Sequence, residues 1–388
     1  MSLSRGMGII LVTVLIALTS VGCSQESSGE MESNQEYYLF VGTYTGEGSE
    51  GIYLYKFNSA DGSVSSLIET AEASNPSYLV ISPDHANVYA VSEGGDAPTD
   101  SVSSFAFDKA TGQLSFLNRQ SSQGKGPCYV SIDAKGQAVF AGNYGGGSLA
   151  MLPVNEDGAL AEASAAIQHE GSSANQARQQ SPHVHCTYVS PDNNYLFATD
   201  LGTDKVTGYA FNADEVTLEK EPAYVFDAEP GAGPRHLTFH PNGEYAYLVN
   251  ELNGTVVAFS YSDGSLDPLQ TISTLPEGYD GAISGADIHV SPDGDYLYAS
   301  NREDLNNIVI YSIDQQSGEL TKVGEQASGG VHPRNFMIDP TGQFLLVANR
   351  HTDNIVIFNR DEDTGQLSPT GTEIEVSQPV CLKMIPVE

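Results

Sequence analysis

The chain has 388 residues and carries 50 acidic against 16 basic side chains, which gives a formal net charge of −34. A surface of that charge repels nucleic acid and anionic lipid headgroups, so we expect neither as a partner. The length suits one large domain better than several small ones.

The first residues differ from the rest of the chain. Arg5 precedes an apolar stretch, residues 7–18, that is too short to span a bilayer but is typical of a secretion signal. Small residues then lead to Cys23. Residues 1–22 therefore predict a lipoprotein-type signal peptide, with Cys23 as the lipidated residue and residues 23–36 as a flexible tether. We expect an extracytoplasmic lipoprotein in the periplasm or at the outer membrane, attached to the membrane only through this lipid. Ser20 departs from the usual leucine, which leaves simple secretion as an alternative.

From residue 37 to residue 388 the chain repeats one pattern at intervals of roughly fifty residues. An apolar run enters a tight turn such as Ser82-Pro83-Asp84, and a second apolar run leaves the turn and ends in a polar residue. Further alternating strands and glycine-containing turns follow, without helical periodicity. The pattern predicts an all-β fold, a seven-bladed β-propeller with four-stranded blades.

The seventh repeat is divided between the two ends of the chain. Residues 378–385 supply its first run and residues 37–42 supply its second. We expect the N- and C-terminal strands to pair in one blade and close the ring, which leaves no free sheet edge there. We also expect a monomer.

Three further cysteines, Cys128, Cys186 and Cys381, each lie within an apolar run. Their odd number and the lack of CxxC or HExxH spacing are not typical of a disulfide framework or a zinc site. We expect buried free thiols, and neither a metal nor a cofactor.

Hairpin geometry predicts where polar side chains gather. In an antiparallel pair, the residue before the first strand and the residue after the second lie side by side on the edge opposite the turn. In a propeller that edge forms one rim of the central channel. It collects Asn143, His183, His185, Arg235, His236, Glu251, Asn301, Arg302, Arg334 and Asn349. Guanidinium groups match carboxylate and phosphate oxygens, and a histidine and a carboxylate beside them supply an acid and a base.

Several segments near this rim match a known pattern. Residues 169–185 read HEGSSANQARQQSPHVH, and residues 233–237, 249–252, 299–302 and 333–336 read GPRHL, VNEL, ASNR and PRNF. From residue 37 to the C-terminus the chain resembles the bacterial lactonase family with a seven-bladed propeller. That family includes propeller-type 6-phosphogluconolactonases and is related to fungal carboxy-cis,cis-muconate cyclases.

The resemblance implies an active site on the rim. Its catalytic residues would be His185, Arg235, Glu251 and Arg302. Arg334 is the other candidate for the last role, and His183 competes with His185, because alternation places both histidines on the same side of the sheet. We expect the substrate to be held by His183, Arg334, Asn143, Asn301 and Asn349.

The activity that the resemblance implies is hydrolysis of a small-molecule sugar lactone without a metal. The substrate would be 6-phospho-D-glucono-1,5-lactone or, because the chain carries an export signal, a related extracytoplasmic lactone. Glu251 or His185 would act as general base while an arginine stabilises the oxyanion. The chain has no G-x-S-x-G motif, which disfavours an acyl-enzyme.

Three other functions are compatible with the same residues. A muconate-type cyclase would use the same arginines to close a lactone instead of opening it. An exported propeller can also be a binding platform without enzymatic activity. A calcium-dependent sugar lactonase would need Asn143, Asn250, Asn301 and Glu251 as ligands, which is a weak set because it holds only one carboxylate.

Overall fold

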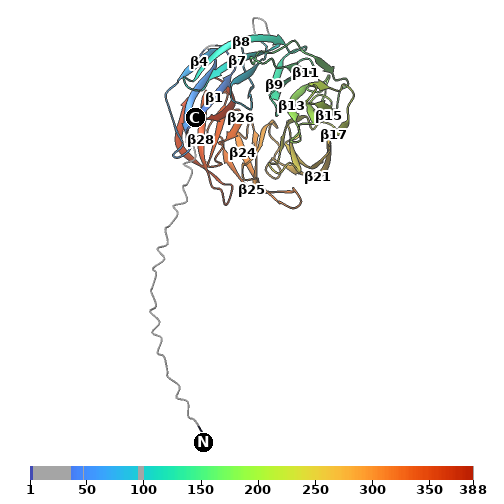
Figure 1. Ribbon diagram of the computed structural model, residues 1–388. Helices are drawn as coiled ribbons and strands as arrows, with labels where there is room; N and C mark the ends of the chain where they lie inside the picture. The colour runs from blue at the N-terminus through green and yellow to red at the C-terminus, as the bar shows by residue number, and fades with distance from the viewer. Residues whose placement is uncertain (3–35, 47, 95–99, 388) are drawn as a thin grey trace. The chain divides into compact units, whose positions relative to one another are not determined.

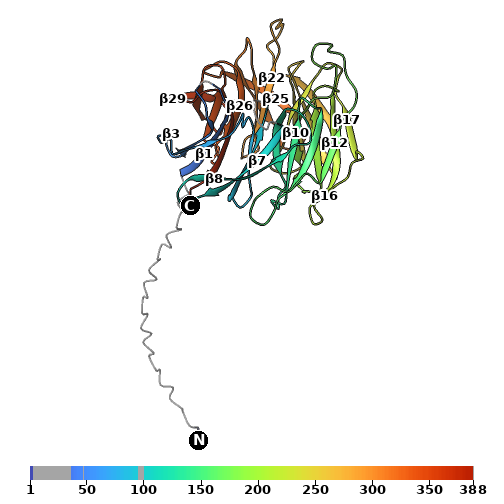
Figure 2. The same ribbon diagram turned by 90° about the horizontal axis from the view of Figure 1, so that it is seen from above.

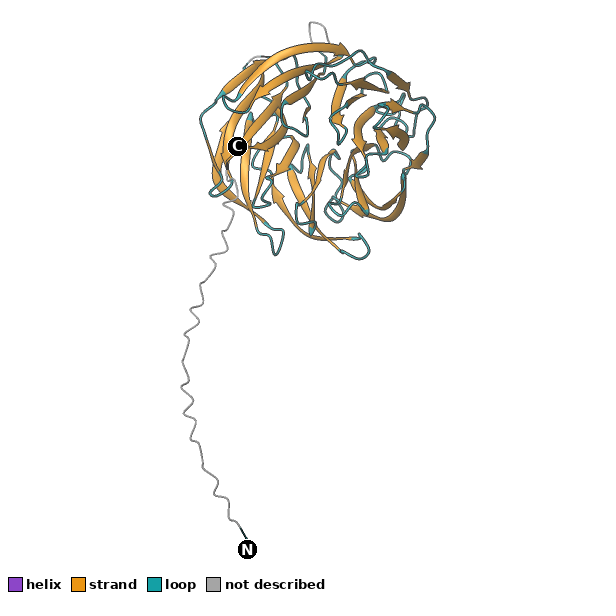
Figure 3. Ribbon diagram, in the orientation of Figure 1, coloured by secondary structure: helices purple, strands orange, loops and turns teal. Residues whose placement is uncertain are grey.

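The computed structural model describes residues 1–2, 36–46, 48–94 and 100–387. Every regular element in these ranges is a β-strand, and they form seven sheets arranged in a ring (Figures 1 and 3). The predicted seven-bladed β-propeller is confirmed. Cys23 and the predicted signal and tether, apart from their first two residues and Glu36, lie outside the described residues. The described part of the chain contains no helix with the length and hydrophobicity of a membrane span.

Blade 1 closes the ring. It consists of β30 (Pro379–Pro386), β1 (Glu36–Thr43), β2 (Gly51–Asn58) and an outer edge formed by β3 (Ser63–Val64) and β4 (Glu69–Glu72). The antiparallel pairing of β1 with β30 places Leu39 opposite Met384 and Val41 opposite Leu382. The predicted closure by the two ends of the chain is therefore confirmed.

Three blades follow in chain order. Blade 2 contains β5 (Leu79–Ile81), β6 (Asn87–Ser92), β7 (Ser101–Asp108) and β8 (Gln113–Ser121). Blade 3 contains β9 (Pro127–Ile132), β10 (Ala138–Asn143), β11 (Ser148–Pro153) and β12 (Ala165–Gln168). Blade 4 contains β13 (Val184–Val189), β14 (Tyr195–Asp200), β15 (Lys205–Asn212), β16 (Thr217–Leu218) and β17 (Tyr224–Asp227). In blades 1 and 4 the outer strand is split into two short pieces that pair with the same neighbour.

The last three blades each have four continuous strands. Blade 5 contains β18 (Pro234–Phe239), β19 (Tyr245–Asn250), β20 (Thr255–Ser262) and β21 (Ser265–Ser273). Blade 6 contains β22 (Gly285–Val290), β23 (Tyr296–Asn301), β24 (Asn307–Ile313) and β25 (Leu320–Ala327). Blade 7 contains β26 (Pro333–Ile338), β27 (Phe344–Asn349), β28 (Asn354–Arg360) and β29 (Leu367–Glu375).

The first strand of each blade lies nearest the axis of the ring. First strands of neighbouring blades contact one another: β9 contacts β13, and β18 contacts β22. In contrast, β17, β21 and β25 lie at the outer edge of the ring (Figure 1). In Figure 2, which is seen from above, strands of blades 2, 3 and 4, such as β7, β10 and β17, follow one another from the middle of the view to its right. The residues that begin first strands and end second strands therefore surround the central channel.

Apolar side chains fill the space between adjacent blades. Second-strand residues such as Phe40, Phe140 and Leu248 are fully buried, which is typical of sheets covered on both faces. Tyrosines also link the blades, because Tyr89 Oη donates a 3.1 Å hydrogen bond to the carbonyl of Gly158 in the next blade. Cys128, Cys186 and Cys381 are free and buried, as predicted.

Candidate functional site

Two sets of residues surround one mouth of the channel. One set directly follows the second strand of each blade and consists of Tyr44, Glu93, Tyr144, Leu201, Glu251, Arg302 and Arg350. The other set lies at β-bulges in first strands and consists of Cys128, His185, Arg235, Ala286, Arg334 and Val380. A bulge leaves one residue unpaired and turns its side chain out of the regular alternation. Because each bulge lies opposite the end of the second strand, both sets point to the same mouth.

A cavity of about 180 Å³ opens there. It is lined by Tyr44, Glu93, Cys128, Tyr144, Arg178, His185, Glu251, Arg302 and Arg334. Each of the seven blades contributes at least one of these residues, so the cavity lies at the axis of the ring. Three of the four side chains predicted to be catalytic line it directly, and the fourth, Arg235, is bonded to Glu251.

Glu251 is the electrostatic centre of this cavity. Its Oε1 accepts a 2.6 Å hydrogen bond from Arg178 Nη2. Its Oε2 lies 3.0 Å from Arg235 Nε and 3.1 Å from Arg302 Nη2. Burial raises the pKa of this carboxyl, but the guanidinium groups outweigh burial and lower the pKa of Glu251 to about 2. Glu251 is therefore a permanent anion that holds three cations together.

Arg235 is anchored from below by a buried network. Its Nη1 donates to the carbonyl oxygen of Ala286 and to Nε2 of His236 at 3.2 Å. Because a guanidinium can only donate, His236 must carry its proton on Nδ1, which donates to Asp287 at 2.7 Å. Burial lowers the pKa of His236 to about 3, so the ring is neutral. The network fixes the direction in which the Arg235 fork points.

Arg302 has a donor without a partner. Its Nη2 donates to the carbonyl oxygen of Gly285 at 3.1 Å and pairs with Glu251, whereas its Nε is buried and makes no hydrogen bond to the described residues. A buried donor left unpaired is costly, by about 1–3 kcal/mol. Arg302 lines the cavity, so its guanidinium group is placed to donate to an oxygen atom of a bound molecule, although Nε itself is shielded from solvent.

The two candidate histidines lie in different places. His185 occupies the bulge and lines the cavity, with its Nδ1 3.7 Å from Cys128 Sγ. His183 precedes the strand, stacks on Tyr144 at 4.5 Å, and has its Nδ1 2.8 Å from the Tyr144 carbonyl oxygen. Both rings lie against Tyr144, since the His185 ring makes an edge contact with it at 5.4 Å. Only His185 lines the cavity, because β13 begins at Val184 and its bulge is at His185. Burial lowers the pKa of His185 well below its ordinary value, and Arg235 lowers it further.

Arg334 belongs to the opposite side of the cavity. Its Nη2 lies 3.8 Å from Glu93 Oε2, and its guanidinium lies 5.5 Å from the ring of Tyr44. Arg350 stacks closer on the same ring, at 4.3 Å. The two arginines proposed as alternatives, Arg302 and Arg334, therefore both line the cavity but face different carboxylates.

The three predicted substrate-binding asparagines do not line the cavity. The Nδ2 atoms of Asn143 and Asn349 donate to the carbonyl oxygens of Ser122 and Ser328 at 2.9 and 3.0 Å. Asn301 accepts a 2.9 Å hydrogen bond from the Thr274 hydroxyl. All three are fully buried and tie the end of a second strand to the loop that precedes their own blade. That these three residues bind substrate stays a prediction.

Their placement also bears on calcium. Neither these asparagines nor Asn250 reach the cavity in which Glu251 stands. Within the described ranges, no three His, Cys, Asp or Glu side chains are grouped as a metal site. A cation beside Glu251 would also meet three guanidinium groups, which disfavours it electrostatically.

Several cavity residues were absent from the sequence-based set. Glu93, Tyr44 and Tyr144 follow second strands just as Glu251 and Arg302 do, so the repeat itself carried the signal that could have found them. Arg178 lies on the long loop between β12 and β13. Its reach to Glu251 could not be derived from hairpin register.

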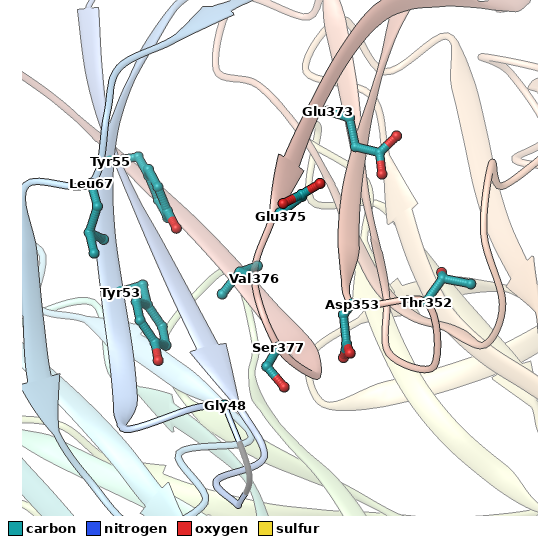
Figure 4. A pocket seen from close by; sticks show the side chains of 10 residues that line it. All are labelled: Gly48, Tyr53, Tyr55, Leu67, Thr352, Asp353, Glu373, Glu375, Val376 and Ser377. Atoms are coloured by element: carbon teal, nitrogen blue, oxygen red, sulfur yellow. The ribbon is translucent and has the colours of Figure 1, made fainter.

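A larger hollow, about 640 Å³, lies elsewhere, between the outer strands of blades 1 and 7 (Figure 4). It is open and is lined by residues such as Tyr53, Tyr55, Asp353, Glu373 and Glu375. No guanidinium or imidazole lines it, so it lacks the groups that would bind an anion or stabilise an oxyanion. The smaller axial cavity is the candidate active site.

Comparison with known proteins agrees with this geometry. The family model for the seven-bladed β-propeller lactonases matches residues 38–384. A 6-phosphogluconolactonase of Bacillus subtilis is 36% identical over 352 residues, which is 90% of this chain and 99% of the relative. A crystal structure of a candidate 6-phosphogluconolactonase from Bacteroides fragilis is 44% identical with a TM-score of 0.85, covering 91% of this chain and 98% of that one.

A further crystal structure, that of a periplasmic gluconolactonase from Pseudomonas aeruginosa, is 37% identical with a TM-score of 0.85 and covers 91% of this chain and all of that one. The resemblance stated from the sequence is thus confirmed, and with it the prediction of an enzyme. The chain belongs to the lactonase family with a seven-bladed β-propeller, which includes relatives named for the hydrolysis of lactones.

Proposed function

We propose that this protein hydrolyses a sugar lactone, either 6-phospho-D-glucono-1,5-lactone or a related aldonolactone. The names of its relatives support the reaction class. The observation that carries the proposal is the axial cavity, in which Glu251 fixes three guanidinium groups and Arg178 and Arg302 line the wall. A lactone is a polar, oxygen-rich ring whose carbonyl oxygen becomes an anion during attack by water.

In this proposal Arg302 supplies the oxyanion-stabilising donor. Its guanidinium group donates a hydrogen bond to the lactone carbonyl oxygen, and that bond strengthens as negative charge develops, an effect worth about 10²–10³ in rate for one donor. Glu251 and Arg235 act by holding Arg302 in place, so no reorganisation is needed at the moment of reaction. His185, neutral and buried, offers a hydrogen bond to the bound ring, and Arg334 and Arg178 offer charge to an anionic substituent.

The electrostatics do not favour Glu251 as the base. A carboxylate whose pKa lies at about 2 is a poor proton acceptor near neutral pH, because Brønsted behaviour ties efficiency to basicity. We further propose a metal-independent reaction, since both carboxylates on the cavity wall already face guanidinium groups. Activity that persists in excess chelator is the expected result.

We also propose that the protein works outside the cytoplasm, attached through lipid on Cys23. The apolar stretch before Cys23 supports export, as does similarity to a periplasmic enzyme. Metabolic labelling with a fatty acid should mark the wild type and not Cys23→Ser. Label retained by the variant would refute the anchor.

The test of function is direct. Purified protein is assayed with glucono-1,5-lactone, its 6-phosphate and other aldonolactones by a pH indicator, against the spontaneous rate in buffer. We expect opening well above that background for at least one member of the panel. A panel opened no faster than in buffer would leave the binding platform as the interpretation, and formation of a lactone from an unsaturated dicarboxylate would favour the cyclase.

A further inference from the structure

The candidate active site contains a second carboxylate. Glu93 follows β6 directly, as Glu251 follows β19, so the two residues occupy equivalent positions in blades 2 and 5. Both line the axial cavity. The hydrogen-bond partners of the two carboxylates differ, and this difference indicates different roles in the reaction.

The hydrogen bonds to Glu93 leave one of its oxygens open. The Tyr44 hydroxyl donates to Oε2 at 2.7 Å and the Ser77 hydroxyl donates to the same atom at 2.5 Å. Arg334 Nη2 is also nearest to Oε2, at 3.8 Å. No hydrogen bond or ion pair from the described residues reaches Oε1. One oxygen thus fixes the carboxylate in place while the other stands free beside the cavity.

The two alternative proton acceptors are less suited to the task. Both oxygens of Glu251 are occupied by guanidinium groups, with Arg178 at 2.6 Å on one and Arg235 at 3.0 Å on the other. His185 is 4% exposed, and protonating it would put a cation beside the buried Arg235. By contrast, 23% of the Glu93 side chain is accessible to solvent, which is where the attacking water must come from.

We propose that Glu93 is the group that accepts the proton of the attacking water and returns it to the leaving oxygen. This inference rests on the proposed lactone hydrolysis. The water oxygen forms a bond to the lactone carbonyl carbon while one water proton moves to Glu93 Oε1. The carbonyl electron pair moves to its oxygen, which Arg302 stabilises.

When that intermediate collapses, the bond from the carbonyl carbon to the ring oxygen breaks. The ring oxygen takes the proton from Glu93 and leaves as a hydroxyl group, and the product carboxyl group loses its remaining proton to solvent. Glu93 is a carboxylate again, so it acts as base and then as acid. Neither an oxidant nor a metal takes part in the step.

The experiment combines removal of the carboxylate with chemical rescue. In Glu93→Ala, kcat for the most reactive lactone of the panel should fall by about 10²–10⁴ while KM changes by less than about threefold. Acetate, fluoroacetate and difluoroacetate, which are close in size and fall in basicity, are then added. A restored rate that rises with the basicity of the added carboxylate is the expected result.

The matched control is Glu251→Ala, in which any rescue should be independent of basicity, because that carboxylate supplies charge and not proton transfer. Glu93→Gln keeps the size of the side chain and should lose as much activity as Glu93→Ala, so it serves if the alanine variant does not fold. The inference is overturned if either folded Glu93 variant keeps kcat within threefold of wild type, or if rescue is absent or insensitive to basicity. Wild-type protein that opens no lactone would instead refute the proposed function, and this inference with it.

Discussion

Replacing Glu251 by glutamine keeps the shape of the side chain and removes the charge that three arginines share. The pKa of this carboxyl falls from 4.5 to about 2 in the folded protein, which corresponds to about 3 kcal/mol of favourable interaction with its charged form. Loss of one partner from a buried ion pair typically costs about 3–5 kcal/mol. Arg235 is 1% exposed and has no route to solvent, so we expect a loss in this range.

The loss is measurable as a shift in Tm. A ring of this size has an unfolding entropy of about 0.7 kcal/mol/K, so 3–5 kcal/mol lowers Tm by about 4–7 °C in scanning calorimetry. Asp227→Asn is the matched control, since its 2.6 Å pair with Lys205 is exposed and should contribute less than about 1 kcal/mol. In addition, kcat/KM should fall by about 10²–10³ because Arg302 is no longer held in place.

The pH dependence of stability tests the direction of the Glu251 pKa shift. The folded pKa of Glu251 is depressed, so its contribution is fully present above about pH 4.5 and is lost as pH falls toward about 2. The stability difference between wild type and Glu251→Gln should therefore be constant near neutral pH and shrink in acid.

A double variant tests the same ion pair. Combining Glu251→Gln with Arg235→Met should lower the free energy of unfolding by less than the sum of the two single-variant losses. An unchanged Tm, or strict additivity in the double variant, would refute the reasoning.

Three further outcomes follow from the same geometry. Arg302→Lys keeps the positive charge but removes the planar guanidinium fork, so kcat should fall by about 10²–10³ in steady-state assays; an unaltered kcat would assign the oxyanion to another group. Arg178→Ala removes a half-exposed guanidinium from a loop, so KM for a phosphorylated lactone should rise about tenfold while Tm moves by less than about 2 °C. Equal increases in KM for charged and uncharged lactones would contradict a role for the charge of Arg178. Because burial raises the pKa of Cys128 and Cys186, both thiols should resist iodoacetamide at pH 8 until the protein unfolds; rapid labelling of native protein in mass spectrometry would disprove this.

The fold was predictable because each blade repeats local signals that agree with one another. Tight turns at Pro83, Pro191 and Pro292 fix the register of the inner hairpins, and the buried apolar runs beside them have no other way to be covered. The closure of blade 1 could be expected because each chain end carries only half of a repeat. The split outer strands of blades 1 and 4 could not, since strands as short as β3 and β16 leave almost no periodicity to read.

The site was only partly predictable, for a physical reason. Hairpin register predicted Arg235 next to Glu251, and the two side chains lie 3.0 Å apart even though Arg235 lies at a bulge in β18. Alternation could not choose between His183 and His185, since the bulge that places His185 at the cavity adds a residue to one strand only and leaves no mark in hydrophobicity. Arg178 reaches Glu251 from the loop between β12 and β13. The path of that loop is fixed by hydrogen bonds such as the one from Gln179 Nε2 to Asp204 at 2.7 Å, which hairpin register does not predict.

The repeat also explains how equivalent positions in different blades can carry opposite charges. The seven positions after the second strands have the same backbone surroundings, yet they carry two tyrosines, two glutamates, two arginines and one leucine. Five of these side chains line the cavity at the channel mouth, whereas Leu201 and Arg350 do not, so the sheet does not depend on one kind of residue there. Sequence can therefore vary at these positions at little cost to the fold, and the chemistry comes from the order in which the residues occur around the ring. Glu251 next to Arg302 makes a fixed ion cluster, while Glu93, three blades away, is left with hydroxyl partners and a free oxygen.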